Sequence, residues 1–148
     1  LTARILQMHD VWHLVAGYTT NSSNEIAISG FQLAQFGHNY SAMFLAAGMA
    51  MSTTKEPRGF NILMQIIMEA WRHGCETPAM MNIDWESEWN NSLEVIRTKY
   101  KIPVYKSVFP ADLLESIENP SLWKKVLMAY QLFRYNLNLR RGKLGAAI

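Results

Sequence analysis

The sequence predicts an all-α fold, a single bundle-like helical domain of about five to six helices over residues 1–148. Apolar residues recur at intervals of three and four along several long stretches, as in helices with one buried face. No stretch alternates apolar and polar residues as a half-buried strand does. With 49% hydrophobic residues among 148, the chain has enough apolar material for one real core.

The first helix is predicted over residues 2–17, with Gly17 as its terminator. Its apolar residues recur near helical spacing: Ile5, Leu6, Met8, Trp12 and Val15. The following residues, 18–24, are rich in Thr, Ser and Asn, which favour turns and caps, so a second helix should begin near Ser22 or Ser23. Glu25 then lies in its first turn.

Residues 26–54 contain no Asp, Glu, Lys or Arg, and this length is sufficient to cross a bilayer. Polar side chains argue against a membrane span, because Ser29, Gln32 and Asn39 follow Glu25 at helical intervals on one face. We therefore expect one long buried helix with a polar stripe. Apolar residues flank the stripe: Phe31, Leu33, Phe36, Met43, Phe44 and Leu45.

A third helix is predicted from Pro57 to Arg72, with Pro57 in its first turn and Gly74 as its stop. A fourth should run from an Asp84 N-cap to the Ile102-Pro103 boundary. Its packed face is expected to contain Trp85, Trp89, Leu93, Ile96 and Tyr100. After a connection at 103–110, the same periodicity predicts a short helix over 111–118 and a long one over 121–139.

Charge and cysteine content exclude several classes of function. The net charge of +2 is small and no motif that reads RNA or DNA is present, so nucleic acid is not an expected partner. The single Cys75 excludes an internal disulfide and a cysteine-rich zinc site. From Asn119 onward the chain has six Lys or Arg and no acid, which suits either an anionic membrane surface or a solvated helix end. Leu1 already continues a helical pattern, as in a fragment of a longer chain.

Four metal-capable residues lie close together near the start of the chain: His9, Asp10, His13 and Glu25. At about 100° per residue, the first three fall within an arc of roughly 100° on a helix. Histidine and carboxylate ligands suit zinc or iron(II), and two His with one carboxylate is the arrangement of iron oxygenases. The expected cofactor is therefore a divalent metal ion, with zinc, iron and magnesium all open.

Two other interpretations compete with metal binding. Ser22 and Glu25 have the spacing of a capping box, and the two His are compatible with simple packing, so the residues alone leave both readings open. The His9-Asp10 pair also occurs in phosphohydrolases of the HD type. Those enzymes need an upstream His, which this chain lacks, and a downstream Asp, for which only Asp84 and Asp112 are present.

The motif and its continuation resemble a known family. The run HDVWH, then eleven residues, then Glu25 is similar to the H-D-x-x-H-x(11)-E signature of the coenzyme Q biosynthesis protein four family. The segments EIAISGFQLAQ and EAWRHG through DWESEWNNSLEVIRTKYKIP resemble its later helices. The resemblance covers residues 1–103. The sequence contains no counterpart of the family's N-terminal helices, and residues 104–148 are a predicted C-terminal helical extension.

The resemblance implies a divalent ion held by His9, Asp10, His13 and Glu25, a prenylated quinone-precursor lipid as ligand, and other ubiquinone-biosynthesis proteins as partners. It also implies a peripheral position on a membrane surface, the matrix side of the inner mitochondrial membrane in a eukaryote or the cytoplasmic face in a bacterium. A homodimer is a further expected assembly. The residues expected to line the lipid site are Ser29, Gln32, Phe36, Asn39 and Met43.

The sequence supports three hypotheses of function. The first is metal-dependent decarboxylation, oxidative in some members, of a polyprenyl hydroxybenzoate-type intermediate. The second is a non-catalytic isoprenoid-lipid carrier or scaffold that organises the ubiquinone biosynthetic complex. The third is an interaction domain whose metal serves folding alone.

Overall fold

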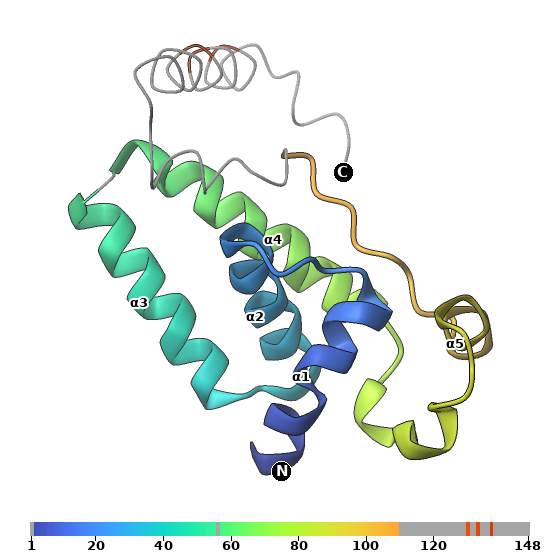
Figure 1. Cartoon of the computed structure of the whole chain (residues 1–148). Helices are drawn as coiled ribbons and strands as arrows, with labels where there is room; N and C mark the ends of the chain where they lie inside the picture. Colours follow the sequence, from blue (N-terminus) through green and yellow to red (C-terminus); the bar gives the residue numbers. More distant parts are fainter. Residues whose placement is uncertain (1, 56, 110–129, 131–132, 134–136, 138–148) are drawn as a thin grey trace. The chain divides into compact units, whose positions relative to one another are not determined.

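The computed structural model describes residues 2–55 and 57–109, together with residues 130, 133 and 137. Within these residues it contains α-helices, three short 3-10 helices and no strand, which confirms the all-α prediction (Figure 1). The α-helices are α1 (Thr2–Ala16), α2 (Ser22–Phe36), α3 (Asn39–Lys55), α4 (Phe60–Glu76) and α5 (Leu93–Tyr100). The 3-10 helices are η1 (Pro57–Gly59), η2 (Met80–Asn82) and η3 (Trp85–Glu88).

The chain divides into two compact units, Leu1–Ala111 and Asp112–Ile148. Helices α1 to α5 all belong to the first unit. The helices predicted at 111–118 and 121–139 lie outside the described residues, apart from the three single positions. That the whole chain forms one domain stays a prediction.

Helix α2 lies between α3 and α4 and packs most extensively on α4 (Figure 1). Two glycines permit this close crossing, because a Cβ on Gly30 would lie 3.0 Å from the Ile67 carbonyl oxygen, and one on Gly74 would lie 2.8 Å from that of Phe31. Gly74 is therefore a contact residue inside α4. The prediction that it ends the helix is wrong, since α4 continues to Glu76 and is capped at Thr77.

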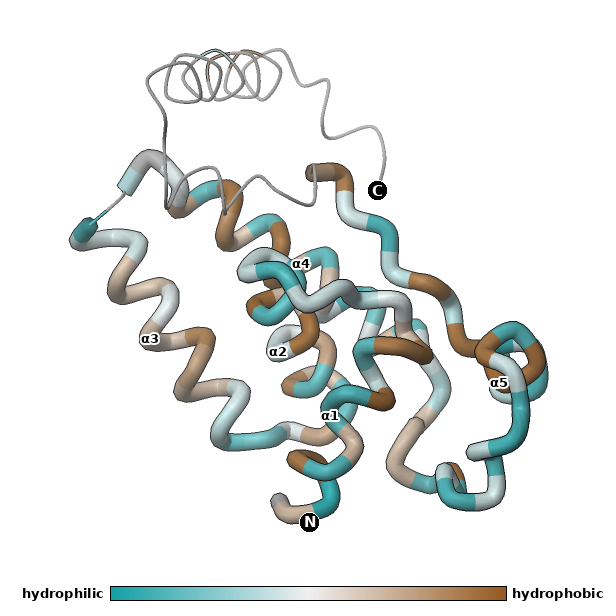
Figure 2. Tube along the Cα trace, viewed as in Figure 1, coloured by the Kyte–Doolittle hydropathy of each residue, from teal (hydrophilic) through white to brown (hydrophobic). Residues whose placement is uncertain are grey.

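The prediction of one long buried helix through residues 26–54 is also wrong. The backbone of Gly37 is left-handed, with φ 60°, and its N–H donates to the Leu33 carbonyl, so α2 stops at Phe36. Helix α3 buries only Ser41 and Leu45 among its residues. Its trace in Figure 2 is mostly pale to tan, as expected for small and apolar residues without charge between its ends. No described helix combines the length and the apolar character needed to cross a membrane.

The helix predicted from Asp84 is interrupted. Ser92 is an N-cap whose hydroxyl accepts from the Val95 N–H, so α5 begins at Leu93 and η3 stands apart from it. The buried Glu88 ties the two together by accepting from Asn91, Lys99 and Tyr100. These hydrogen bonds hold the pKa of Glu88 low, at about 2. Trp89, predicted on the packed face, lies exposed between them.

The end of α1 is fixed by its own turn and by α5. Gly17 has φ 83°, and the N–H groups of Gly17 and Tyr18 both donate to the His13 carbonyl, at 3.0 and 2.9 Å. The first is the bond of an αL cap and the second is the 6→1 bond of a Schellman turn. The prediction that Gly17 terminates this helix is confirmed. The Arg97 guanidinium donates to the carbonyls of Leu14 and Val15, so the last turn of α1 is capped from outside.

Candidate metal site between α1 and α2

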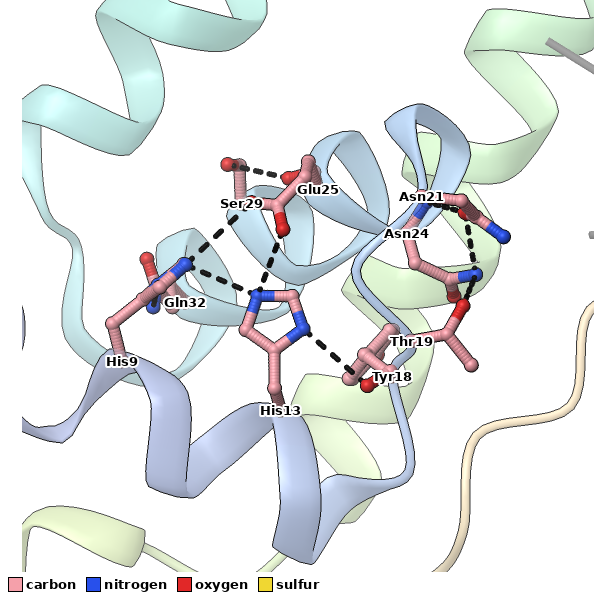
Figure 3. Close-up of polar contacts among 9 residues, drawn as sticks. All are labelled: His9, His13, Tyr18, Thr19, Asn21, Asn24, Glu25, Ser29 and Gln32. Atoms are coloured by element: carbon pink, nitrogen blue, oxygen red, sulfur yellow. Dashed lines mark hydrogen bonds and ion pairs between the residues drawn. The ribbon is translucent and has the colours of Figure 1, made fainter. Parts of the chain in front are cut away.

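His9 and His13 lie one turn apart on α1, and the carboxylate of Glu25, in the first turn of α2, faces both imidazoles (Figure 3). The two Nε2 atoms are 3.0 Å apart. Glu25 Oε1 is 3.4 Å from His13 Nε2, and Oε2 is 3.6 Å from His9 Nε2. One ligand atom from each residue thus lies within 4.8 Å of the others, as a shared ion requires.

The start of α2 aims Glu25 at the two imidazoles. Asn21 is the N-cap, and its side chain accepts from the Asn24 backbone N–H at 2.9 Å. The Asn24 amide in turn donates to Thr19 Oγ1 at 2.8 Å, which fixes the preceding turn. The capping-box interpretation of Ser22 and Glu25 is therefore not the arrangement found. The Glu25 carboxylate therefore does not cap the helix and instead faces His9 and His13.

The backbone fixes the orientation of His13. Its Nδ1 lies 3.3 Å from the Tyr18 carbonyl oxygen, and because a carbonyl only accepts, His13 carries its proton on Nδ1. The lone pair of Nε2 then points into the site. Such a carbonyl partner is the usual support of a metal-binding histidine. His13 is buried, whereas the side chains of His9 and Glu25 are 31% and 39% exposed, so the site opens to one side.

The three residues fit a zinc or iron(II) ion. With metal–nitrogen distances of about 2.0–2.1 Å, two ligand atoms lie about 3.4 Å apart at a tetrahedral angle and about 2.9 Å apart at a right angle. The 3.0 Å between the two Nε2 atoms and the 3.4 Å from His13 Nε2 to Glu25 Oε1 fall in this range. The 3.6 Å from His9 Nε2 to the other carboxylate oxygen, Oε2, is slightly longer. Imidazole favours zinc and iron over magnesium, which prefers oxygen ligands, and three protein ligands leave positions open for a substrate.

Asp10 does not join this group. Its side chain is exposed on α1, about 100° around the helix from His9, and adjacent helical residues do not share a face. The described ligand cluster is therefore His9, His13 and Glu25. A contribution from Asp10 stays a prediction.

A pocket of about 220 Å³ opens beside the cluster. Ser29 and Gln32, both predicted, line it together with Ile5, Leu6, His9, Glu25, His38, Tyr40 and Phe44. Phe36, Asn39 and Met43 are not lining residues: Phe36 packs on Trp12 with ring centroids 4.5 Å apart, and the other two are exposed. The polar stripe of α2 ends where Gly37 breaks the helix. Asn39 and Met43 therefore do not continue the helix face of Ser29 and Gln32, as the prediction of one long helix required.

The sequence interpretation missed the lining residues that come after the break. His38 is buried, and Tyr40 and Phe44 lie on the first turns of α3. The signal for them was Gly37 itself, because a left-handed residue turns the chain back over the stripe of α2. Because residues 26–54 were interpreted as one continuous helix, Gly37 was not recognised as a helix end.

Comparison with known proteins relates the chain to one group. The family model described as Coenzyme Q (ubiquinone) biosynthesis protein Coq4 matches residues 1–106. The mitochondrial ubiquinone biosynthesis protein COQ4 homolog of Danio rerio is 28% identical over 120 residues, 80% of this chain and 41% of that protein. The mitochondrial coq4 protein of Schizosaccharomyces pombe is 24% identical over 99 residues, 67% of this chain and 36% of that protein.

A solved structure agrees with these relatives. The crystal structure of a proposed ubiquinone biosynthesis protein from Nostoc punctiforme superimposes with a TM-score of 0.60 at 33% identity. The match covers 66% of this chain and 48% of that one. The chain therefore spans less than half the length of each of these three proteins.

Proposed function

This chain belongs to the Coenzyme Q (ubiquinone) biosynthesis protein Coq4 family, and on that premise we propose that it is a metal-dependent decarboxylase of a prenylated aromatic acid. The substrate class is a polyprenyl hydroxybenzoate-type intermediate of ubiquinone biosynthesis. The observation that supports the proposal most strongly is the His9, His13 and Glu25 cluster at the edge of an apolar pocket. Two of the three candidate metal ligands, His9 and Glu25, line this pocket.

The size of the pocket suits the ring of such a substrate. A cavity of about 150 Å³ holds benzene, so 220 Å³ accommodates a substituted ring and not a long isoprenoid tail. The tail would lie outside, over the exposed apolar side chains of Leu6, Tyr40 and Phe44. The same side chains would touch lipid if the protein sits peripherally on a membrane, at the matrix side of the inner mitochondrial membrane or a bacterial cytoplasmic face. The curated relatives are named mitochondrial.

In the proposed reaction, the bond between the ring and its carboxylate breaks and carbon dioxide leaves. The ring carbon takes a proton, or in the oxidative form a hydroxyl at the expense of an oxidant such as dioxygen. The ion held by His9, His13 and Glu25 would supply positive charge beside the carboxylate or phenol oxygen. The apolar side chains of Ile5, Leu6 and Phe44 would contact the ring and reduce its exposure to water, which would strengthen that electrostatic effect.

The test is release of labelled carbon dioxide. The full chain is incubated with a divalent metal and a prenylated hydroxybenzoate labelled with ¹³C at the carboxylate, and gas and ring product are quantified together. We expect equal amounts of both, lost in His13→Ala and retained in Trp89→Ala, whose side chain lies exposed away from the pocket. Release that is unchanged in His13→Ala would contradict the proposal.

A non-catalytic carrier or scaffold is the second candidate, favoured by the open pocket bordered by exposed apolar side chains. It predicts that the purified protein retains prenylated lipid, as measured by mass spectrometry of an organic extract, without turnover in the labelled assay. Binding to other ubiquinone-biosynthesis proteins belongs to this candidate too. A preparation free of lipid that releases carbon dioxide would exclude it.

A further inference from the structure

A chain of hydrogen bonds connects α3 to the candidate metal ligands (Figure 3 shows its part from Gln32 onward). The Ser41 hydroxyl donates to Gln32 Oε1 at 3.1 Å, and Gln32 Nε2 donates to His9 Nδ1 at 2.7 Å. Both Ser41 and Gln32 are buried, at 1% and 4% exposure. A buried glutamine so close to a ligand is an outer support of the site and not simply a wall of the pocket.

In this series of hydrogen bonds, from Ser41 to the Tyr18 carbonyl, every donor points the same way. His13 keeps its proton on Nδ1 for the Tyr18 carbonyl, so its Nε2 is an acceptor. The 3.0 Å contact between the two Nε2 atoms then requires His9 to donate from Nε2. His9 Nδ1 is consequently an acceptor, as the Gln32 amide arrangement demands. In this arrangement the proton of His9 is on Nε2.

Binding of an ion by His9 requires its proton to be on the other ring nitrogen. To bind through Nε2, His9 needs its lone pair there, so its proton must be on Nδ1 and Gln32 must accept. A glutamine meets both requirements, because a half-turn of its amide exchanges the N–H donors for the carbonyl oxygen. After that turn the amide N–H faces Ser41, whose hydroxyl oxygen is able to accept. No other hydrogen-bond partner of His9 Nδ1 occurs among the described residues.

We propose that Gln32, supported by Ser41, is a positioning residue that selects the tautomer of His9, donating to Nδ1 when the His9 proton is on Nε2 and accepting from Nδ1 when Nε2 binds an ion. This inference rests on the proposed function to the extent that His9 is a metal ligand. It predicts that the acceptor capacity of residue 32, and not only its volume, determines metal affinity.

Two substitutions of similar size separate these possibilities. In Gln32→Met the hydrogen bond is lost, and zinc affinity of the full chain should fall about 10- to 100-fold, as for other outer-sphere partners of metal ligands. In Gln32→Glu the carboxylate only accepts, so affinity should return to the wild-type value or exceed it. Affinity is measured by competition with a chromophoric chelator.

Gln35→Met is the matched control. Gln35 lies on the same helix and donates to the carbonyls of Gly74 and Thr77, so its loss should lower thermal stability without changing zinc affinity. A second readout is the ¹⁵N NMR spectrum of the histidine rings. His9 should carry its proton on Nε2 in the metal-free wild type and on Nδ1 with zinc, but on Nδ1 in both states of Gln32→Glu.

Zinc binding by Gln32→Met at wild-type affinity, or one unchanged His9 tautomer in both states of the wild type, would overturn the positioning role while leaving the metal site intact. A wild-type protein that binds no zinc would overturn the positioning role and the metal site of the proposed function together. Zinc binding by the wild type distinguishes the two cases, and its loss in His13→Ala shows that the zinc measured is bound at this site.

Discussion

His13 depends on the turn that ends its own helix. The left-handed Gly17 allows the chain to reverse, and the reversal places the Tyr18 carbonyl against His13 Nδ1. A terminator that the sequence predicts for reasons of helix capping thus also fixes the tautomer of a candidate ligand. The sequence could not predict this second role, because it depends on where the carbonyl after the turn is directed.

Replacement of Gly17 by Ala should destabilise the protein more than the same change at Gly37. Both glycines have positive φ, so each alanine incurs the left-handed penalty of about 1–2 kcal/mol. A Cβ on Gly17 would also lie 2.5 Å from Val104 Cγ1, whereas nothing lies within 4 Å of one on Gly37. Urea unfolding of both variants measures the difference, and equal losses would contradict the packing described here.

His73 is a buried histidine held in its neutral form. Its Nε2–H donates to the Pro103 carbonyl at 2.9 Å, and its Nδ1 accepts from the Tyr18 hydroxyl at 2.7 Å. Burial lowers the pKa of His73 below its ordinary value of 6.5. The unfolded chain therefore takes up a proton at this residue at a higher pH than the folded chain does.

Stability should consequently fall as the pH drops below about 6.5, the pKa of an unfolded histidine, and the contribution of His73 is fully present above it. His73→Gln, which cannot be protonated, should reduce that part of the decline. The measurement is the urea midpoint between pH 7.5 and 5 with a chelator present. The pKa of about 2 at Glu88 places its own loss of stability below about pH 4.5, outside this window. An identical pH profile for His73→Gln and wild type would exclude the assignment.

At the scale of elements, the crossing of α2 and α4 holds Glu25 and Gln32 against α1. The crossing is tight because Gly30 and Gly74 bring the two backbones together. Sequence periodicity predicted helical structure in both segments, yet it missed the end of α2 at Gly37 and assigned Gly74 to a helix stop. A glycine used for contact and a glycine used for termination look alike along one chain. The turn at Trp89 and Asn90 was missed because apolar spacing continued across it.

Two alanine substitutions inside helices should change stability in opposite directions. Gly74→Ala gains helix propensity but forces a methyl group to within 2.8 Å of the Phe31 carbonyl oxygen, so we expect a net loss of about 1–3 kcal/mol. Gly48→Ala, in α3 with nothing within 4 Å, should gain about 0.5–1 kcal/mol. Thermal unfolding compares them, and a stabilised Gly74→Ala variant would refute the close crossing.

At the scale of the whole molecule, the fold class and the placing of His9 and His13 on one helix face can be predicted from the sequence, because helical periodicity and the i, i+4 spacing are local. The family signature implied Asp10 and Glu25 as the remaining ligands. The pocket cannot, since its lining combines α1, α2 and the start of α3 after an unpredicted break. Gln32 illustrates the limit: its place on the polar stripe was predicted, but its bond to His9 required the packing of two helices.

The proposed reaction and the proposed role of Gln32 both require a single ion shared by His9, His13 and Glu25. Calorimetric titration of the metal-stripped full chain with zinc tests this requirement most directly. We expect one ion per chain, and a loss of affinity in His13→Ala and Glu25→Gln that exceeds the roughly 100-fold upper range for outer-sphere partners. The exposed carboxylate variant Glu94→Gln should bind as wild type does. Undiminished binding of one zinc ion in His13→Ala and Glu25→Gln, or none in the wild type, would contradict the shared site.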